Sequence, residues 1–226
     1  MLFIVGQQVA TAQKTEKRDL SVFTEISLKN DAKVILTQGA TQSVTVTAKE
    51  STLEKLITEV KDRKLIIRYP NDTWFKSNWN PGEVEVYITI PQIDDLSVSG
   101  SGSIIADEKV ESLILEVAVS GSGSVKLKDI KAEKFTASLS GSGNVVVSGK
   151  EPVGEFKGRI SGSGNIKGID LPTKNADITI AGSGNCHITA NEKLTARIAG
   201  SGNVIYRGNP SIDSSVAGSG QVKEDR

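Results

Sequence analysis

A short motif, Ser or Ala followed by Gly-Ser-Gly, occurs seven times in the C-terminal part of the chain. Successive copies start 21, 20, 21, 20, 18 and 18 residues apart. A near-constant period of this size is typical of a solenoid, in which each repeat forms one rung. With the residue that follows each motif, the copies are Ser99–Ser103, Ser120–Ser124, Ser140–Asn144, Ser161–Asn165, Ala181–Asn185, Ala199–Asn203 and Ala217–Gln221.

The glycines of each copy occupy the same alternate positions as the neighbouring apolar residues. At the first copy, the alternate positions are Leu96, Val98, Gly100 and Gly102, and the next such series begins at Leu113. Side chains of a strand point alternately to its two faces. We therefore expect the glycines to point inward with the core, and the Ser and Asn residues between and after them to point outward.

Two explanations of these glycines compete. At the tip of a hairpin they would supply positive φ, and the alternation could break across the turn. At a narrow corner, a larger inward side chain would collide with the opposite wall. The unbroken alternation favours the corner. The sequence thus predicts an all-β fold, a parallel β-helix over residues 96–226, built as a single-stranded solenoid with about 20 residues per rung. An antiparallel meander or a prism is the alternative.

Residues 20–95 are expected to form a β-rich N-terminal cap that is continuous with the β-helix. Alternating residues at Lys33–Thr37 and Ser43–Thr47, joined near Gly39, predict a hairpin. The spacing of apolar residues from Ser51 to Ile57 predicts one or two turns of helix. Further strands are expected over Thr58–Val60, Leu65–Tyr69 and Glu83–Ile90.

The first residues resemble the end of a secretory signal. Leu2–Val5 is apolar, and Ala10–Ala12 has the small-x-small form of a signal-peptidase site. We expect residues 1–12 to be a signal-peptide remnant and residues 13–19 to be a disordered linker. No other segment approaches the ~18 apolar residues that a membrane span needs, so an exported protein without a transmembrane segment is predicted.

Charge and cysteine content exclude several functions. Lys plus Arg and Asp plus Glu both number 27, so the formal net charge is zero. A nucleic-acid surface needs clustered positive charge, which this balance argues against. Cys186 is the only cysteine, which rules out an intramolecular disulfide and a multi-cysteine metal site.

Two sets of residues are candidates for ligand binding. Trp74, Phe75 and Trp79 lie in one loop that is rich in turn-forming residues. Exposed aromatic rings can stack on sugars or dock a partner, although the same rings could instead cover the open end of the core. Asn144 and Asn165 follow two of the glycine motifs, where stacked Asn side chains can form hydrogen-bonded ladders or present a flat binding face.

No catalytic, metal or cofactor site is expected. Cys186 and His187 are adjacent in a predicted strand and point to opposite faces, so they cannot form a dyad. The glycine motifs precede no predicted helix, as a phosphate-binding loop requires, and no Asp follows them, as calcium-binding nonapeptide repeats require. The carboxylates that a polysaccharide-active enzyme would need are dispersed among connections, at Asp107, Glu108, Asp129, Glu133, Asp170 and Asp177.

The chain resembles the DUF2807 family, the putative auto-transporter adhesin, head GIN domain, which is common in Bacteroidetes. The resemblance rests on the glycine motifs together with Val44–Val46, Leu65–Ile67 and Val84–Ile88 followed by Pro91, and it covers about residues 20–222. It implies an exported β-helix of pectin-lyase-like appearance and carries over no catalytic residue.

These features predict a non-enzymatic, exported adhesion or scaffolding module of the periplasm, outer membrane surface or extracellular space. Its expected partner is a glycan or a cell-envelope protein. A polysaccharide-binding or polysaccharide-active protein is the alternative.

Overall fold

The computed structural model describes residues 13–70 and 79–225, which are almost entirely β-structure. The predicted signal remnant, residues 1–12, lies outside this range. The elements are β1 (Gln13–Arg18), β2 (Glu25–Leu28), β3 (Lys33–Gln38), β4 (Ser43–Lys49), α1 (Glu50–Leu53), β5 (Ile57–Lys61), β6 (Lys64–Arg68), β7 (Glu85–Ile90), β8 (Asp95–Gly100), β9 (Ser103–Gly121), β10 (Ser124–Gly141), β11 (Asn144–Val147), β12 (Val153–Gly162), β13 (Asn165–Gly182), β14 (Asn185–Gly200), β15 (Asn203–Arg207), β16 (Ser211–Ala217) and β17 (Gln221–Glu224).

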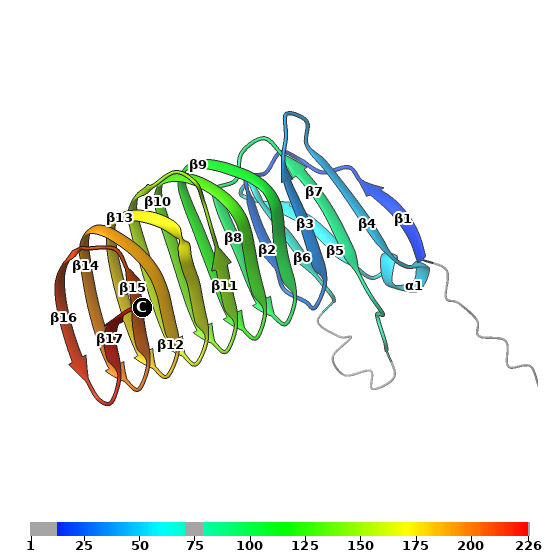
Figure 1. Cartoon of the computed structure of the whole chain (residues 1–226). Helices are drawn as coiled ribbons and strands as arrows, with labels where there is room; N and C mark the ends of the chain where they lie inside the picture. Colours follow the sequence, from blue (N-terminus) through cyan, green and yellow to red (C-terminus); the bar gives the residue numbers. More distant parts are fainter. Residues whose placement is uncertain (1–12, 71–78, 226) are drawn as a thin grey trace, which may run out of the picture.

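Stacked parallel rungs make up most of the molecule, and their corners line up along one edge (Figure 1). Each rung has a first wall that leads into a glycine corner and a second wall that leaves it. The strands pair with their equivalents in neighbouring rungs so that like residues meet, for example Ser120 with Ser140 and Ser140 with Ser161. The prediction of a parallel β-helix is confirmed, with about six turns.

The N-terminal region extends both walls. β2 pairs in parallel with β8 in the first wall, and β3 pairs in parallel with the start of β9 in the second wall. β5 and β6 form an antiparallel hairpin beside β2, with Asp62 and Arg63 at positive φ in its turn. A short helix is present as α1, but it spans only Glu50–Leu53, and Ile57, which was expected to continue it, begins β5.

The predicted hairpin between β3 and β4 is wrong. β7 lies between them, parallel to β3 and antiparallel to β4. The turn formers near Gly39 are therefore used in a wider connection that leaves room for a strand from much later in the sequence. Local alternation identified both strands but carried no information about this non-local partner.

The expectation of a disordered linker over residues 13–19 is wrong for Gln13–Arg18. This segment is β1, an antiparallel strand on the edge of β4. The Lys14 ammonium lies 2.7 Å from Glu50 Oε1, and the hydroxyls of Thr15 and Thr47 lie 3.0 Å apart. Its polar composition reflects its position as a solvent-exposed edge strand, where charged residues also discourage pairing with other chains.

The two glycines of each corner have different roles. The first, such as Gly141 with φ of 115°, lies in the positive-φ region, so the corner turns sharply rather than gently. The second, such as Gly143, is buried, and a Cβ built on it would lie 2.5 Å from the Gly123 carbonyl oxygen. The inward direction that the alternation predicts is correct for the second glycine, whereas the first serves mainly to turn the backbone.

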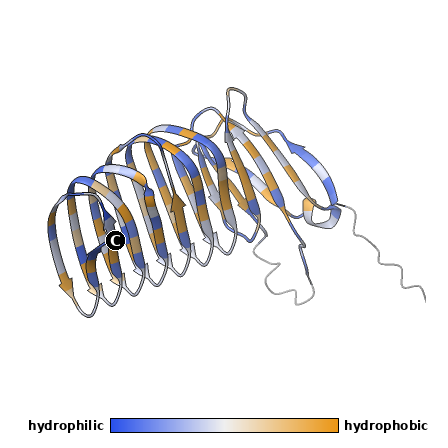
Figure 2. Ribbon diagram, viewed as in Figure 1, coloured by the Kyte–Doolittle hydropathy of each residue, from blue (hydrophilic) through white to orange (hydrophobic). Residues whose placement is uncertain are grey.

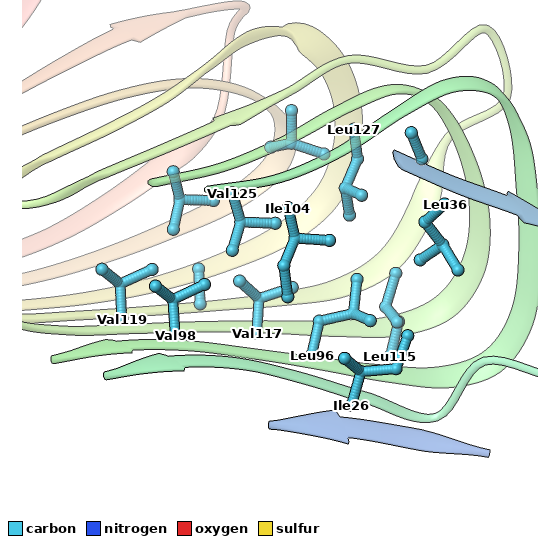
Figure 3. Close-up of a cluster of buried hydrophobic side chains, with 14 of the residues drawn as sticks. Ile26, Leu36, Leu96, Val98, Ile104, Leu115, Val117, Val119, Val125 and Leu127 are labelled. Atoms are coloured by element: carbon cyan, nitrogen blue, oxygen red, sulfur yellow. The ribbon is translucent and has the colours of Figure 1, made fainter. Parts of the chain in front are cut away.

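A single hydrophobic core runs along the inside of the rungs and into the N-terminal region. Apolar segments alternate with polar ones along the strands (Figure 2). Side chains of the first wall, such as Leu96 and Val117, face those of the second wall, such as Ile104 (Figure 3). Phe135 and Phe156 stack on adjacent rungs with ring centroids 5.5 Å apart. Leu113 departs from the predicted inward series, because it is 74% exposed at the rounded end opposite the corners.

Candidate functional site

An aromatic pocket of about 500 Å³ lies where the N-terminal region meets the first glycine corner. The Tyr69 and Trp79 rings meet edge to face, with centroids 4.7 Å apart. Trp79 thus joins the pocket, whereas Trp74 and Phe75 lie outside the described residues. The residues that line the pocket are Lys29, Asn30, Asp31, Tyr69, Trp79, Pro81, Ser99, Gly100 and Ser101.

Two hydrogen-bond donors of this pocket's residues are buried and have no partner in the described part of the chain. They are the side-chain amide nitrogen of Asn30 and the indole nitrogen of Trp79. Asn30 is only 7% exposed, and its Oδ1 accepts a hydrogen bond from the Ala32 backbone N–H at 3.1 Å. An unpaired buried donor is costly. Both donors belong to residues that line the same pocket.

Charged groups surround the two rings. The Tyr69 hydroxyl donates to Asp31 Oδ1 at 3.0 Å, and the Lys55 ammonium lies 5.4 Å from the centre of the Trp79 ring. Burial, followed by the nearby Asp31 charge, raises the pKa of Tyr69 above its usual range. Tyr69 therefore remains a neutral donor at physiological pH, and it holds the Asp31 carboxylate at the pocket.

The second candidate set, Asn144 and Asn165, belongs to a ladder on the second wall. Asn165 Nδ2 donates to Asn144 Oδ1 at 3.2 Å. The same bond recurs from Asn185 to Asn165 at 3.1 Å and from Asn203 to Asn185 at 2.9 Å. Each inner amide thus uses one donor and one acceptor within the ladder. The ladder stabilises the stack, and each donating amide keeps a second N–H.

A larger groove of about 1160 Å³ lies away from the corners, beside the rounded end of the rungs. Leu113 and Ile114, which are 74% and 48% exposed, contribute apolar surface to it. Ionisable side chains supply most of the rest, and the acids outnumber the bases. They are Glu25, Lys64, Asp94, Asp95, Glu111, Glu116, Lys131, Glu133 and Glu151.

Three of these carboxylates form a row across adjacent strands. Asp95 of β8 is in register with Glu25 of β2 on one side and with Glu116 of β9 on the other. The Lys64 ammonium lies 2.9 Å from Glu25 Oε2 and 3.8 Å from Asp95 Oδ1. Burial is the largest cause that raises the pKa of Asp95; Lys64 opposes it, and the charges of Glu25 and Glu116 add to it.

Sequence reasoning missed this row because its members are far apart in the chain. Glu25, Asp95 and Glu116 each stand directly before an inward apolar residue, Ile26, Leu96 or Val117. That shared position is the signal that could have revealed them, once the strands were known to pair. To find the row in this way, one must also know the register between β2 and β8, which no local sequence pattern predicts.

Three of the six acids that the sequence showed as dispersed, Asp107, Asp129 and Asp170, lie in ion pairs on the surface. Asp107 pairs with Lys128 at 3.2 Å and Asp129 with Lys150 at 3.5 Å. Cys186 is fully buried, and burial raises the pKa of its thiol to about 12. Within residues 13–70 and 79–225, no group of three or more His, Cys, Asp or Glu side chains could hold a metal ion. The same residues include no helix with the length and hydrophobicity to cross a bilayer.

Comparison with known protein families identifies the family of this chain. Residues 22–210 match the DUF2807 family, described as putative auto-transporter adhesin, head GIN domain. The chain belongs to this family, as its glycine motifs predicted. A search of curated proteins gives no match.

Solved structures share the fold over nearly the whole chain. A putative adhesin from Bacteroides fragilis, 21% identical, has a TM-score of 0.88 and aligns over 96% of this chain and 98% of its own. A putative lipid binding protein from Parabacteroides distasonis, 28% identical, has a TM-score of 0.78, with 95% and 97% covered. A putative adhesin from the same organism, 22% identical, has a TM-score of 0.74, with 96% and 98% covered.

Proposed function

We propose that the protein is a non-enzymatic adhesion module of the bacterial cell envelope that binds a glycan in the aromatic pocket of Tyr69 and Trp79. The observation that carries this proposal is the pair of buried donors at one pocket, Asn30 Nδ2 and Trp79 Nε1, which have no partner among the described residues. Membership of a family described as putative adhesins supports the adhesive role. The signal-like residues 1–12 support export.

A sugar suits the chemistry of this pocket. Its hydroxyl oxygens can accept from Asn30 and Trp79, and its hydroxyl protons can be donated to the Asp31 carboxylate. The apolar face of a pyranose can pack on an aromatic ring, as amphipathic aromatic residues commonly do at binding sites. The similar structure of a putative lipid binding protein from Parabacteroides distasonis makes the headgroup of a glycolipid a suitable source of such a sugar.

A glycan array probed with the full chain tests the proposal. Trp79→Ala removes both the ring and the donor, whereas Trp79→Phe retains a ring and removes only the indole N–H. We expect Trp79→Ala to abolish binding to the recognised glycans. Trp79→Phe should weaken binding roughly tenfold, as expected for one lost hydrogen bond to a buried group.

Tyr87→Ala is the matched control, because Tyr87 is an aromatic residue on β7 that is 44% exposed and does not line the pocket. It should leave glycan binding unchanged. The proposal is wrong if no glycan is bound, or if the Trp79 and Tyr87 variants lose binding to the same extent. Circular dichroism of each variant establishes that the β-helix is retained.

A second candidate function, polysaccharide hydrolysis, is favoured by the row of Glu25, Asp95 and Glu116 in the larger groove. Its carboxylates lie on adjacent strands, about 5 Å apart in the backbone, which is near the separation of the two acids in retaining glycosidases. The raised pKa of Asp95 suits a general acid. Adhesion is preferred because of the family description and because Lys64 already binds Glu25.

Release of reducing ends from a panel of polysaccharides separates the two functions. Hydrolysis predicts turnover that Asp95→Asn abolishes and Trp79→Ala need not change. Adhesion predicts binding in the glycan array with no turnover by the unmodified chain.

A further inference from the structure

The second wall of the β-helix carries a column of basic and apolar side chains beside the Asn ladder. We call it the basic column. Its members point outward and meet in register from one rung to the next, through β10, β11, β13, β14, β15 and β17. They are Lys126, Val146, Lys167, His187, Ile205 and Lys223.

The three lysines of the basic column are exposed and form no ion pair in the described part of the chain. Most other lysines of the repeats behave differently; Lys128, Lys131 and Lys134, for example, each lie within 4 Å of a carboxylate. The basic column itself contains no acid. A protein of zero formal net charge therefore presents one strip in which lysines are not offset by acids.

The neighbouring column adds hydrogen-bonding groups without adding charge. It runs Ser124, Asn144, Asn165, Asn185, Asn203 and Gln221, in the same register. Because Asn165, Asn185 and Asn203 each donate one amide N–H within the ladder, the second N–H of each is available to a ligand. Ammonium groups and amide donors thus lie side by side along the solenoid axis.

We propose that these two columns bind an acidic polysaccharide laid along the solenoid axis. The lysines would pair with its carboxylates, and the amides would bind its hydroxyls. Lys126 and Lys223 are separated by five strand spacings, or about 24 Å, so one extended chain of several sugars contacts all three lysines. This strip is separate from the aromatic pocket, and the proposal does not depend on that pocket.

The density and surroundings of the charges favour a polysaccharide over other polyanions. Duplex DNA carries a negative charge about every 1.7 Å of its axis, far more than three lysines over about 24 Å can neutralise. A membrane surface would favour projecting apolar side chains, whereas Val146 and Ile205 are half-buried within the wall. A chain with spaced carboxylates and many hydroxyls matches both columns.

The hollow at the C-terminal end of the basic column, about 480 Å³, is lined by His187, Ile205 and Lys223, and also by two acids. One of them, Asp225, accepts a hydrogen bond from Arg207 at 2.8 Å. The other, Glu224, is in register with Tyr206 rather than with the basic column. Lys126 and Lys167 do not line this hollow with its two acids, so substitutions there give the clearest test.

Binding of the full chain to polygalacturonate, with neutral dextran as comparison, tests the proposal. Lys126→Glu/Lys167→Glu should weaken polygalacturonate binding at least about tenfold, because two charge contacts become repulsive. The matched control is Lys157→Glu/Lys193→Glu, which makes the same change in net charge at exposed lysines of the first wall. It should have little effect, and added salt should weaken binding by the unmodified chain.

Three results would overturn the proposal. The first is no preference for polygalacturonate over dextran. The second is an equal loss in the two double variants, which would point to net charge rather than to the strip. The third is tighter binding of single-stranded DNA or of phosphatidylglycerol vesicles than of polygalacturonate. Retained binding by Trp79→Ala is expected, because the aromatic pocket is a different site.

Discussion

Replacing the second glycine of a corner tests the physical basis of the fold. In Gly143→Val, even the first added carbon would lie 2.5 Å from the Gly123 carbonyl oxygen and 2.6 Å from Val119 Cγ1. The same carbonyl accepts the Asn144 backbone N–H at 3.1 Å. The new side chain therefore collides with a backbone hydrogen bond between rungs and with the core.

The expected loss is at the upper end for overpacking, about 3 kcal/mol or more in the free energy of unfolding. For a chain of this length, such a loss lowers the melting temperature by roughly 6 to 12 °C. Ser142→Val places the same side chain at the neighbouring exposed position, where a surface substitution typically changes stability by only about 0.5 kcal/mol. Thermal and urea unfolding, followed by circular dichroism, measure both variants.

The result that would refute this reasoning is an equal loss in the two variants. It would mean that Gly143 does not face the core and the preceding rung. Gly141→Ala adds an independent comparison, because the strain there comes from φ of 115° as well as from contact with Gly121. It should also destabilise clearly, whereas a neutral effect would contradict the sharp corner.

Three further predictions concern single side chains. Asn165→Ala breaks two ladder bonds and should lower the unfolding free energy by about 1 to 2 kcal/mol; an unchanged urea midpoint would show that the ladder adds no stability. The Cys186 thiol, whose pKa burial raises to about 12, should resist a thiol reagent at pH 8 in the native protein and react only on unfolding; rapid native labelling would contradict its burial. Folding raises the pKa of Asp95 and lowers the pKa of Asp213, which Arg197 binds. Asp95→Asn should therefore raise the stability at pH 7 and lose this advantage below the unfolded pKa near 3.8, whereas Asp213→Asn should lower the stability at pH 7 and become neutral in acid. Urea midpoints at pH 7 and pH 3 that shift in the same direction for both variants would contradict these assignments.

Repetition made the β-helix predictable. Identical residues at a constant spacing meet in neighbouring rungs, so the pairing of Ser120 with Ser140, or of Asn144 with Asn165, follows from the period itself. The inward direction of Gly143 follows from alternation. The positive φ of Gly141 does not, because alternation describes the direction of a side chain and not the backbone turn.

The N-terminal region was harder to predict because it does not repeat. The residues of β3 and β4 alternate between apolar and polar as strand residues should. However, β7, which separates these two strands, comes from 35 or more residues later in the sequence. β1 shows no apolar alternation, because an edge strand is held by backbone pairing to β4 rather than by burial.

The candidate site was predictable only in part. The concentration of aromatic residues pointed to Trp79, but its partners Tyr69 and Asn30 come from other segments, and only the fold brings them together. Neither residue is unusual in sequence. What marks the site is a property of packing, namely that Asn30 and Trp79 have buried donors with no acceptor within the described chain.

Titration of a Trp74→Phe variant with a glycan that the array identifies tests the central claim most directly, because Trp79 is then the sole tryptophan of the chain. Glycan bound in the aromatic pocket should shift the emission of Trp79 saturably, and Asn30→Asp, which retains the Oδ1 acceptor and removes the donor, should weaken the measured affinity. Binding that leaves Trp79 emission unchanged, or that Asn30→Asp does not affect, would contradict glycan recognition in this pocket.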